Sequence, residues 1–295
     1  MAFLTVADAA RLWGVSERTV RNYCADGRIP GAELIGKTWA IPEGAERPGR
    51  RPRTQTKPRA LLDVLREEKA SSTSGGIYHH VQVEFAYNSN HIEGSRLTYE
   101  QTRLIFETNT IGVADAVRVD DILETANHFR CVDTIIDSAN RRLTERLIKG
   151  LHAQLKQGTT DSRKGWFAVG DYKRLPNEVG GRETTAPEEV AGHMAELIER
   201  YEALPRRTLE DIVAFHAEFE AIHPFQDGNG RVGRLVMFKE CLRNGVTPFI
   251  ITDEVKLFYY RGLSQWRRER GYLLDTCRAA QDAFAELLRR FRIEG

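Results

Sequence analysis

The sequence predicts a mainly α-helical protein in which a small N-terminal domain precedes a larger helical bundle with one small β-hairpin. Three observations predict this fold class. Apolar residues recur at helical spacing over most of residues 60–295, one short Gly-rich segment interrupts that pattern, and a basic, Pro-rich stretch follows residue 46. With 41% hydrophobic and 29% charged residues, the 295-residue chain has a globular composition, which excludes collagen-like and wholly disordered classes.

The small N-terminal domain begins with two short helices. Thr5 and Asp8 have capping-box spacing, and apolar residues at helical spacing follow up to Trp13. Gly14 ends this helix, and Ser16 is a good N-cap for a second one that ends near Gly27. These dimensions are typical of a helix-turn-helix. Residues 32–41 alternate around a Gly turn and predict a small hairpin, or wing.

Residues 4–42 resemble the winged helix-turn-helix modules of the excisionase and MerR type. The resemblance lies in Leu-Thr-x-x-x-Ala-Ala, Gly-Val-Ser-x-x-Thr-Val-Arg and Gly-Arg-Ile-Pro-Gly, in that order. It implies DNA as a partner, with Arg18, Arg21 and Asn22 on the outer face of the second helix nearest to base edges. A protein-interaction module and a vestigial one are the alternatives.

The charge of the chain is divided unevenly. The formal net charge is +1, but residues 1–59 hold eleven basic and six acidic residues, so the remainder carries −4. Residues 47–59 contain six basic residues, three prolines and no acid, which predicts an extended linker that can lie along DNA phosphates. We therefore expect domains at residues 1–46 and 60–295, joined by this linker.

The larger domain is predicted to be a helical bundle without internal repeats. Amphipathic runs cover residues 78–90, 98–107, 116–139, 144–156, 187–203, 208–222, 231–243 and 254–291. Residues 170–181 are too short and too Gly-rich for a helix, and they predict a hairpin.

Membrane segments and cysteine sites are not expected. No stretch approaches the roughly 18–20 apolar residues of a membrane helix, and the first residues lack the pattern of a signal peptide. We expect a soluble, cytoplasmic protein with no membrane partner. Its four cysteines form no CxxC pair, which favours buried, reduced thiols over zinc or disulfides: Cys24, Cys131, Cys241 and Cys277.

Chemically reactive side chains are densest between His223 and Arg234. Gly228, Gly230 and Gly233 have the spacing of a dinucleotide-binding fingerprint, but that motif follows a buried strand. Here the preceding residues 209–222 have helical periodicity, and no alternation of strands and helices surrounds them. A Rossmann fold is therefore not expected.

The same segment suits phosphate-transfer chemistry. His223 titrates nearest neutrality and can accept a proton, and Asp227 is an oxygen ligand suited to Mg²⁺. The remaining residues can hold phosphates through backbone amides, a neutral side-chain donor or guanidinium groups: Gly228, Gly230, Asn229, Arg231 and Arg234. The combination indicates transfer from a nucleoside triphosphate, the alternative being a structural loop with ion pairs.

Residues 223–234 match His-x-Phe-x-Asp-Gly-Asn-Gly-Arg-x-x-Arg, the core motif of the Fic family, at every defined position. The resemblance extends over about residues 78–275. It implies a protein adenylyltransferase that moves AMP from ATP, with Mg²⁺, onto a Ser, Thr or Tyr hydroxyl of a target protein. His223 would be the general base and Asp227 the metal ligand, with phosphates held by the residues just listed. Gly230, where phosphorylating relatives usually have Lys, favours nucleotidyl transfer.

A second element of the family lies upstream, at residues 89–94. Ser89, Glu93 and Gly94 fit the inhibitory motif Ser/Thr-x-x-x-Glu-Gly/Asn, which stands N-terminal to the core motif in the second class of the family. A carboxylate at Glu93 that reaches Arg234 would occupy the charge meant for the γ-phosphate. The alternative for Glu93 is a surface carboxylate near a helix end.

Three weaker expectations complete the site. Tyr259 and Tyr260 resemble an aromatic pair that shapes the adenine pocket, although aromatic residues at this spacing are also common in cores. Residues 172–181 resemble the target-binding flap, whose edge can pair with a target segment. The remaining histidines have no metal-like spacing and are expected to be ordinary surface or core residues: His79, His80, His128, His152, His193 and His216.

Two alternative functions remain open. The protein can be a DNA-binding transcriptional regulator whose Fic domain senses nucleotide, or a Fic enzyme that removes AMP or transfers another phosphoester. The oligomeric state is also open, with a homodimer as one alternative.

Overall fold

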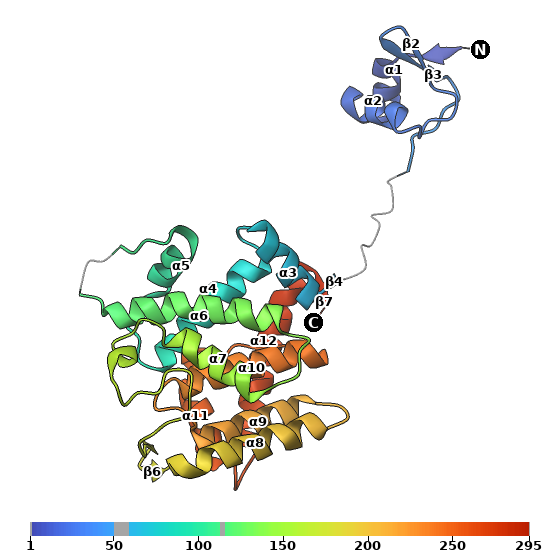
Figure 1. Cartoon of the computed structure of the whole chain (residues 1–295). Helices are drawn as coiled ribbons and strands as arrows, with labels where there is room; N and C mark the ends of the chain where they lie inside the picture. The colour runs from blue at the N-terminus through green and yellow to red at the C-terminus, as the bar shows by residue number, and fades with distance from the viewer. Residues whose placement is uncertain (1, 50–58, 113–115, 295) are drawn as a thin grey trace. The chain divides into compact units, whose positions relative to one another are not determined.

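The computed structural model describes residues 2–49, 59–112 and 116–294, apart from the side chains of Arg182 and Glu294. The chain divides into two compact units, Met1–Lys57 and Pro58–Gly295 (Figure 1). Most of the expected linker, residues 50–58, lies outside the described residues. Among the helices described, none is both long and apolar enough to span a membrane.

The N-terminal unit is a helix-turn-helix with a three-stranded sheet. Its elements are β1 (Phe3–Leu4), α1 (Val6–Trp13), α2 (Glu17–Ala25), β2 (Glu33–Ile35) and β3 (Thr38–Pro42). The capping box of Thr5 with Asp8 and the Ser16 N-cap are both present, as predicted. The sheet is antiparallel in the order β1-β3-β2, so the predicted hairpin gains β1 as an additional strand.

The larger unit is helical, as predicted. Its helices are α3 (Leu61–Ser71), α4 (Ile77–Ile92), α5 (Tyr99–Thr108), α6 (Val119–Asp137), α7 (Glu145–Leu155), α8 (Pro187–Ala203), α9 (Leu209–Ile222), α10 (Asn229–Asn244), α11 (Lys256–Gln265) and α12 (Gly271–Phe291), with short 3₁₀ turns η1 (Asp161–Arg163) and η2 (Asp253–Val255). Sequence periodicity missed α3. It also merged α11 and α12, which are separate helices packed against each other.

The helix α10 lies at the centre of this unit and packs against α4, α6, α7 and α9 (Figure 1). Its sides are buried nearly all round, including the charged pair Lys239 and Glu240, whose Nζ and Oε1 atoms are 2.6 Å apart. Burial of both charges is tolerated because they pair with each other and Glu240 also accepts a hydrogen bond from Tyr201 at 3.0 Å. The residues of the 223–234 motif therefore lie at the start of a helix that is buried on nearly all sides.

Two short pairs of strands complete the larger unit. β5 (Glu178–Val179) and β6 (Arg182–Glu183) form an antiparallel hairpin. A hairpin was expected over residues 170–181, but the observed one starts at Glu178 and its second strand lies beyond that segment. Its two-residue turn needs positive φ angles, which Gly180 and Gly181 supply at 57° and 74°. β4 (Arg59–Ala60) and β7 (Ile293–Glu294) pair in parallel and bring together the two ends of the unit.

The four cysteines are free and buried, as predicted. Burial raises the pKa of the Cys24 and Cys277 thiols, that of Cys277 to about 12, so neither is a ready thiolate.

The crossing of α11 and α12 yields a stability prediction. A Cβ at Gly262 would lie 2.7 Å from the Leu273 Cα and 2.8 Å from the Leu273 N, both backbone atoms that cannot move aside cheaply. We expect Gly262→Ala to lower the free energy of unfolding by about 1–3 kcal/mol in urea denaturation.

The control is Gly192→Ala on α8, where a Cβ meets no atom within 4 Å. Because glycine weakens a helix interior, this variant should be more stable than wild type by about 0.5–1 kcal/mol. Equal stabilities of the two variants would contradict close packing at Gly262.

Candidate active site

The loop between α9 and α10 is shaped by two residues with left-handed backbone conformations. His223 ends α9 at φ 53°, and its N–H donates to the carbonyl of Phe219 at 2.9 Å. Gly228 starts α10 at φ 84°. A non-glycine residue at positive φ is uncommon, so the fold holds His223 in a strained conformation that directs it into the site.

Asn229 closes this loop from within. Its Oδ1 accepts from the backbone N–H of Phe225, and its Nδ2 donates to the carbonyl of the same residue, both at 2.8 Å. In this structure both polar groups of the side chain therefore serve the loop. The phosphate-holding role expected of its amide stays a prediction. The first backbone N–H groups of α10, like those of any helix, have no carbonyl partner within the helix and are suited to an anion.

His223 is kept neutral by its surroundings. Burial and, to a smaller extent, the nearby Lys173 ammonium together lower the pKa of its imidazole from 6.5 to about 4. A neutral imidazole can accept a proton at physiological pH, as a general base requires. Sequence reasoning missed Lys173, a buried residue whose backbone N–H donates to the carbonyl of Pro224 at 2.9 Å.

Asp227 lies beside two cations. Its Oδ2 is 2.7 Å from Lys156 Nζ and 3.1 Å from Arg231 Nη2. Burial alone would raise the pKa of this carboxyl, but Arg231 and Lys156 hold it well below its usual range. Arg231 also forms an ion pair with Glu124 of α6.

These residues fit a magnesium ion that arrives with a nucleotide. The Asp227 side chain is 48% exposed and anionic, and Mg²⁺ is commonly held by one carboxylate together with substrate phosphates and water. Among the described residues, no group of three His, Cys, Asp or Glu side chains is placed to hold a metal by itself.

Arg234 is almost completely buried and is held by the predicted upstream motif. Its Nε donates to Ser89 Oγ at 3.0 Å, and its Nη2 donates to the Ser89 carbonyl at 2.9 Å and to Glu93 Oε1 at 2.8 Å. The structure thus brings Glu93 and Arg234 together across 141 residues of sequence. Gly94 follows Glu93 with φ 94° at the turn after α4.

Gly230 makes room for this contact. A Cβ at that position would collide with the Glu93 carboxylate and would lie 2.9 Å from Arg234 Nη1. Gly233 has a different role, since a Cβ there would lie 2.8 Å from Glu220 Oε1 and 2.9 Å from the His216 ring. Gly230 therefore allows the Glu93 contact, and Gly233 allows close packing against Glu220 and His216. The glycines with dinucleotide-fingerprint spacing follow a helix, α9, as expected, and not a strand.

The two adjacent tyrosines separate in the structure. Tyr259 is completely buried and its hydroxyl is 2.6 Å from His216 Nε2, which places it in the core below Arg234. Tyr260 is 40% exposed and donates to the carbonyl of Ile92 at 3.3 Å, beside Glu93. Of the expected adenine pair, only Tyr260 is accessible to a ligand, and its role there stays a prediction.

His152 supports the loop, a role that sequence reasoning did not assign. Its ring stacks on Phe225, with centroids 4.0 Å apart and an 8° angle between planes. Nδ1 accepts from the Gly170 N–H at 3.0 Å, so the other ring nitrogen donates to the Asp227 carbonyl at 3.2 Å. Its place on the buried face of α7 was visible in the sequence, but its partners were not.

The segment expected to bind targets is anchored to the same loop. Asn177 Nδ2 donates to the Phe225 carbonyl at 3.1 Å, and the Leu175 N–H donates to Gln226 Oε1 at 3.3 Å. Lys173 Nζ donates to Asn177 Oδ1 at 2.7 Å. The segment that leads into β5 therefore lies against the loop that follows His223, and Leu175 and Val179 are about half exposed.

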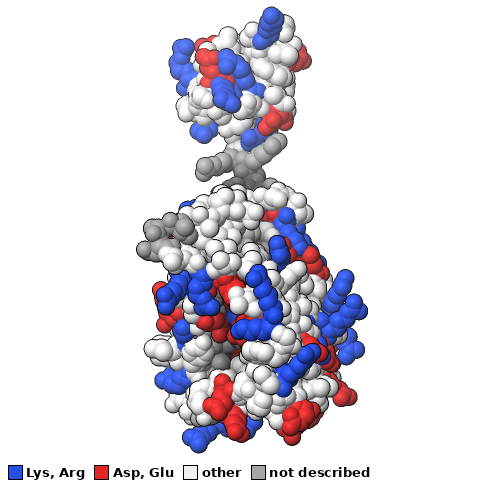
Figure 2. Space-filling model, turned by 60° about the vertical axis from the view of Figure 1, so that its left-hand side comes forward, with Lys and Arg blue, Asp and Glu red and all other residues white. Residues whose placement is uncertain are grey.

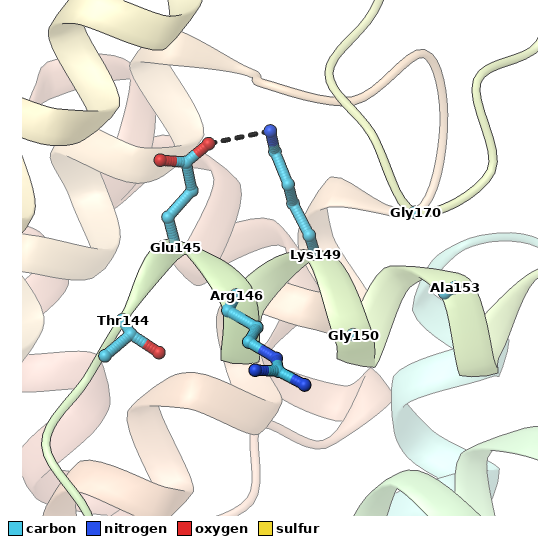
Figure 3. A pocket seen from close by; sticks show the side chains of 7 residues that line it. All are labelled: Thr144, Glu145, Arg146, Lys149, Gly150, Ala153 and Gly170. Atoms are coloured by element: carbon cyan, nitrogen blue, oxygen red, sulfur yellow. Dashed lines mark ion pairs between the residues drawn. The ribbon is translucent and has the colours of Figure 1, made fainter.

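Two hollows lie near these residues. A cavity of about 210 Å³ is lined by Asn90, Glu93, Gly94, Ser95, Arg118, Asp120, Asp121, Glu124, Lys156, Asp161, Asp227 and Arg231. It is smaller than the ~300–1,000 Å³ of typical small-molecule sites, and Glu93 forms part of its wall. A broader groove of about 660 Å³ follows α7 from Thr144 to Ala153 and reaches Gly170 (Figure 3).

The broader groove contains none of the motif residues. Figure 3 shows Glu145 and Lys149 rising from the same side of α7 and pointing toward each other, while Arg146 points the other way. The ion pair between them measures 2.7 Å. Lys149 also pairs with Asp171 at 2.8 Å and lies 3.9 Å from the centre of the Tyr172 ring. The groove therefore borders the hairpin segment and not the phosphate site.

The helix-turn-helix unit presents the residues expected to contact DNA. Arg18, Arg21 and Asn22 are exposed on α2, and Arg21 pairs with Glu17 at 2.6 Å. Acidic and basic side chains are interspersed on the face of each unit that Figure 2 shows. Residues 2–49 hold six residues of each sign, so the basic excess of the N-terminal part comes entirely from residues 50–59.

Comparison with known proteins finds a family match in each unit. A family model described as Fic/DOC family matches residues 142–241, and a model described as helix-turn-helix domain matches residues 3–45. The chain therefore contains a Fic/DOC domain that carries the His223–Arg234 loop, preceded by a helix-turn-helix domain.

Two curated relatives named protein adenylyltransferase Fic are similar to this chain. The one from Drosophila willistoni is 29% identical over 218 residues, which cover 70% of this chain and 40% of that protein. The one from Drosophila grimshawi is 30% identical over 190 residues, which cover 60% of this chain and 36% of that protein. The chain thus spans less than half the length of these relatives.

Solved structures show the same fold. A Fic domain containing signaling protein from Bacteroides thetaiotaomicron superposes with a TM-score of 0.63 at 25% identity, covering 78% of this chain and 95% of that one. A Fic family protein from Desulfovibrio desulfuricans gives a TM-score of 0.58 at 22% identity, and the match covers 78% of this chain and 73% of that one.

The lowered pKa of His223 is directly testable. We expect the imidazole in the metal-free protein to titrate near pH 4, since burial and Lys173 both disfavour its protonated form. It should stay neutral from about pH 5 upward, gaining its proton only as the pH falls below that. Nuclear magnetic resonance of ¹⁵N-labelled histidine, assigned with His223→Gln, measures this midpoint, and a value near 6.5 would contradict the site described here.

Proposed function

We propose that this protein is a protein adenylyltransferase that transfers AMP from ATP to a Ser, Thr or Tyr hydroxyl of a target protein and is held inactive by Glu93. The observation that carries the proposal is the convergence of His223, Asp227 and Arg234 around the N-terminus of α10, with Glu93 bonded to Arg234 at 2.8 Å. The resemblance to proteins named adenylyltransferase supports it.

In the proposed reaction, neutral His223 accepts the proton of the target hydroxyl. The hydroxyl oxygen then attacks the α-phosphorus of ATP, a new P–O bond forms to the target, and the bond to the leaving pyrophosphate breaks. The amides at the start of α10 and the Arg231 guanidinium stabilise the negative charge on the phosphates. A magnesium ion held by Asp227 and phosphate oxygens would neutralise further charge.

In this proposal Glu93 inhibits AMP transfer because its carboxylate occupies the Arg234 guanidinium. A γ-phosphate needs a guanidinium partner, and this one already pairs with a carboxylate at close range. ATP that enters beside Glu93 would bind with its α-phosphorus out of line for attack by the hydroxyl, so the rate falls although binding persists.

Releasing Arg234 should activate the protein. We expect Glu93→Gly to raise self-modification with α-³²P-labelled ATP by about 10- to 100-fold, the factor expected for losing a hydrogen bond to a charged group. Glu93→Gln should give an intermediate rise, because it keeps the shape but removes the charge. No increase in either variant would remove the inhibitory role of Glu93.

Intact-mass measurement of Glu93→Gly after incubation with ATP and Mg²⁺ identifies the chemistry. A gain equal to AMP supports the proposal, a gain equal to phosphate supports the phosphorylating alternative, and loss of AMP from a pre-modified target supports removal. The double variant Glu93→Gly/His223→Ala should show no gain, since it lacks the proposed base.

For the target protein we propose docking on the hairpin segment 172–181. Leu175 and Val179 are each nearly half exposed there, and the short strand β5 can pair with an extended target segment. The anchoring of Asn177 to Phe225 would bring that segment next to His223. A homodimer remains a separate proposal, for which light scattering of the full chain is the test.

DNA binding is the second candidate function, favoured by the helix-turn-helix domain. The chain would then be a regulator whose Fic domain senses nucleotide, or a modifier bound near a promoter. Because residues 2–49 carry no net charge, attraction to phosphates depends on the basic residues of 50–59, and α2 would supply base contacts.

These two contributions can be separated in the full chain. Replacing Arg50, Arg51 and Arg53 by Gln should weaken binding to every duplex alike and lower the salt slope by about 0.9 per lost phosphate contact. Arg18→Ala should instead change the preference between sequences. Arg11→Ala, 82% exposed on α1, is the control, and fluorescence anisotropy at several salt concentrations is the measurement. Absence of binding even at low salt would end the DNA proposal.

A further inference from the structure

Lys173 is a buried cation without an acidic partner. It lies in the segment before β5, and only 3% of it is exposed. Burial lowers the pKa of its ammonium from 10.5 to about 8, and no carboxylate among the described residues raises it again. The buried Arg231 and Arg234, in contrast, each form an ion pair with a carboxylate.

The ammonium of Lys173 closes the base of the hairpin β5–β6. Its Nζ donates to Asn177 Oδ1 at 2.7 Å, just before β5, and to Thr184 Oγ1 at 2.5 Å, just after β6. The two partners also bond to each other, since the Thr184 N–H donates to the Asn177 carbonyl at 3.3 Å. One side chain therefore holds both arms of the hairpin.

The main chain of Lys173 is fixed to the loop between α9 and α10. Its N–H donates at 2.9 Å to the carbonyl of Pro224, the residue directly after His223. Asn177 bonds to the same loop, because its Nδ2 donates to the Phe225 carbonyl at 3.1 Å. The hairpin base and the loop are thus joined through Lys173 and Asn177.

Charged groups from three elements act on His223. Burial is the main cause of its lowered pKa, and the Lys173 ammonium is the next. A hydrogen bond with the Glu220 backbone, the Glu93 carboxylate at the end of α4 and the Asp227 carboxylate in the loop all act in the opposite direction. Lys173 is the cation of this set, so it opposes the two carboxylates.

A neutral donor would close the hairpin at a lower free-energy cost. An amide side chain also donates to oxygens, and burying a hydrogen-bonded neutral group costs less than burying a charge that has no counter-ion. A cation retained in such a position points to a role for the charge itself. Beside an imidazole that role is available, because a nearby ammonium disfavours the protonated ring.

We infer that Lys173 is a positioning residue that couples the hairpin to His223: its hydrogen bonds hold the hairpin base against the loop, and its charge acts on the His223 imidazole. The inference deepens the proposed function, on which its part in AMP transfer rests. A target segment that pairs with β5 would be held next to an imidazole that the same lysine keeps unprotonated.

The charge is tested by titrating His223 in the full chain without nucleotide, by nuclear magnetic resonance of ¹⁵N-labelled histidine. Lys173→Met removes the charge and should raise the His223 pKa by about 0.5–1. Lys173→Arg keeps the charge and should leave that pKa close to the wild-type value. Lys173→Gln, which keeps a donor for the hairpin but not the charge, should raise it like Lys173→Met and serves if Lys173→Met does not fold.

Two further variants separate the charge from the hydrogen bonds. Thr184→Val removes one partner of the ammonium but keeps the charge, so it should loosen the hairpin without changing the His223 pKa. Arg174→Met removes the exposed cation next in sequence and should change neither. Hairpin opening is measured at pH 7 as hydrogen exchange of the main-chain N–H of residue 184, which should be about tenfold faster in Lys173→Met and Thr184→Val.

The comparison of these variants decides the inference. An unchanged His223 pKa in folded Lys173→Met or Lys173→Gln would overturn it. An equal rise in Thr184→Val would also overturn it, because the change would then come from loosening and not from charge. Both measurements are made without AMP transfer, so they stand if the proposed activity fails. If it holds, Lys173→Met in the Glu93→Gly background should move the acid limb of the self-modification rate to higher pH.

Discussion

The burial of two arginines on the first turns of α10 is the constraint on which the site depends. Arg231 and Arg234 are only 3% and 2% exposed, and a guanidinium cannot lose its charge at physiological pH. Each must therefore have an acidic partner inside the protein. Arg231 finds Glu124 and Asp227, and Arg234 finds Glu93, which draws α4 and α6 onto the central helix.

This constraint links stability to the proposed inhibition. The carboxylate that satisfies Arg234 in the nucleotide-free protein is the same one that would exclude a γ-phosphate. A phosphate that replaced Glu93 would satisfy the guanidinium equally well, so the exchange need not leave a buried charge without a partner. Arg234 Nη1, which has no hydrogen-bond partner in this structure, is one donor that such a phosphate would gain.

Contacts that are not ion pairs also order the loop between α9 and α10. His152 stacks on Phe225, Asn229 bonds to the main chain of the same residue, and Lys173 bonds to Pro224. These contacts order the loop that follows His223 and connect the segment before β5 to it. The N-terminal unit has its own core and capped helices, and its helix-turn-helix does not depend on any of these contacts.

Local features of the sequence determined most of the helices, the caps at Thr5 and Ser16, the presence of a hairpin in the Gly-rich segment and the identity of the 223–234 loop, because each depends on residues that are near one another in the sequence. The pairing of Glu93 with Arg234 was predictable only through resemblance to a family. The tertiary structure alone decided the roles of Lys156, Lys173 and His152, the pairing of β4 with β7 and the packing of α3. Their partners lie tens to hundreds of residues away, and helical periodicity carries no information about which buried faces meet.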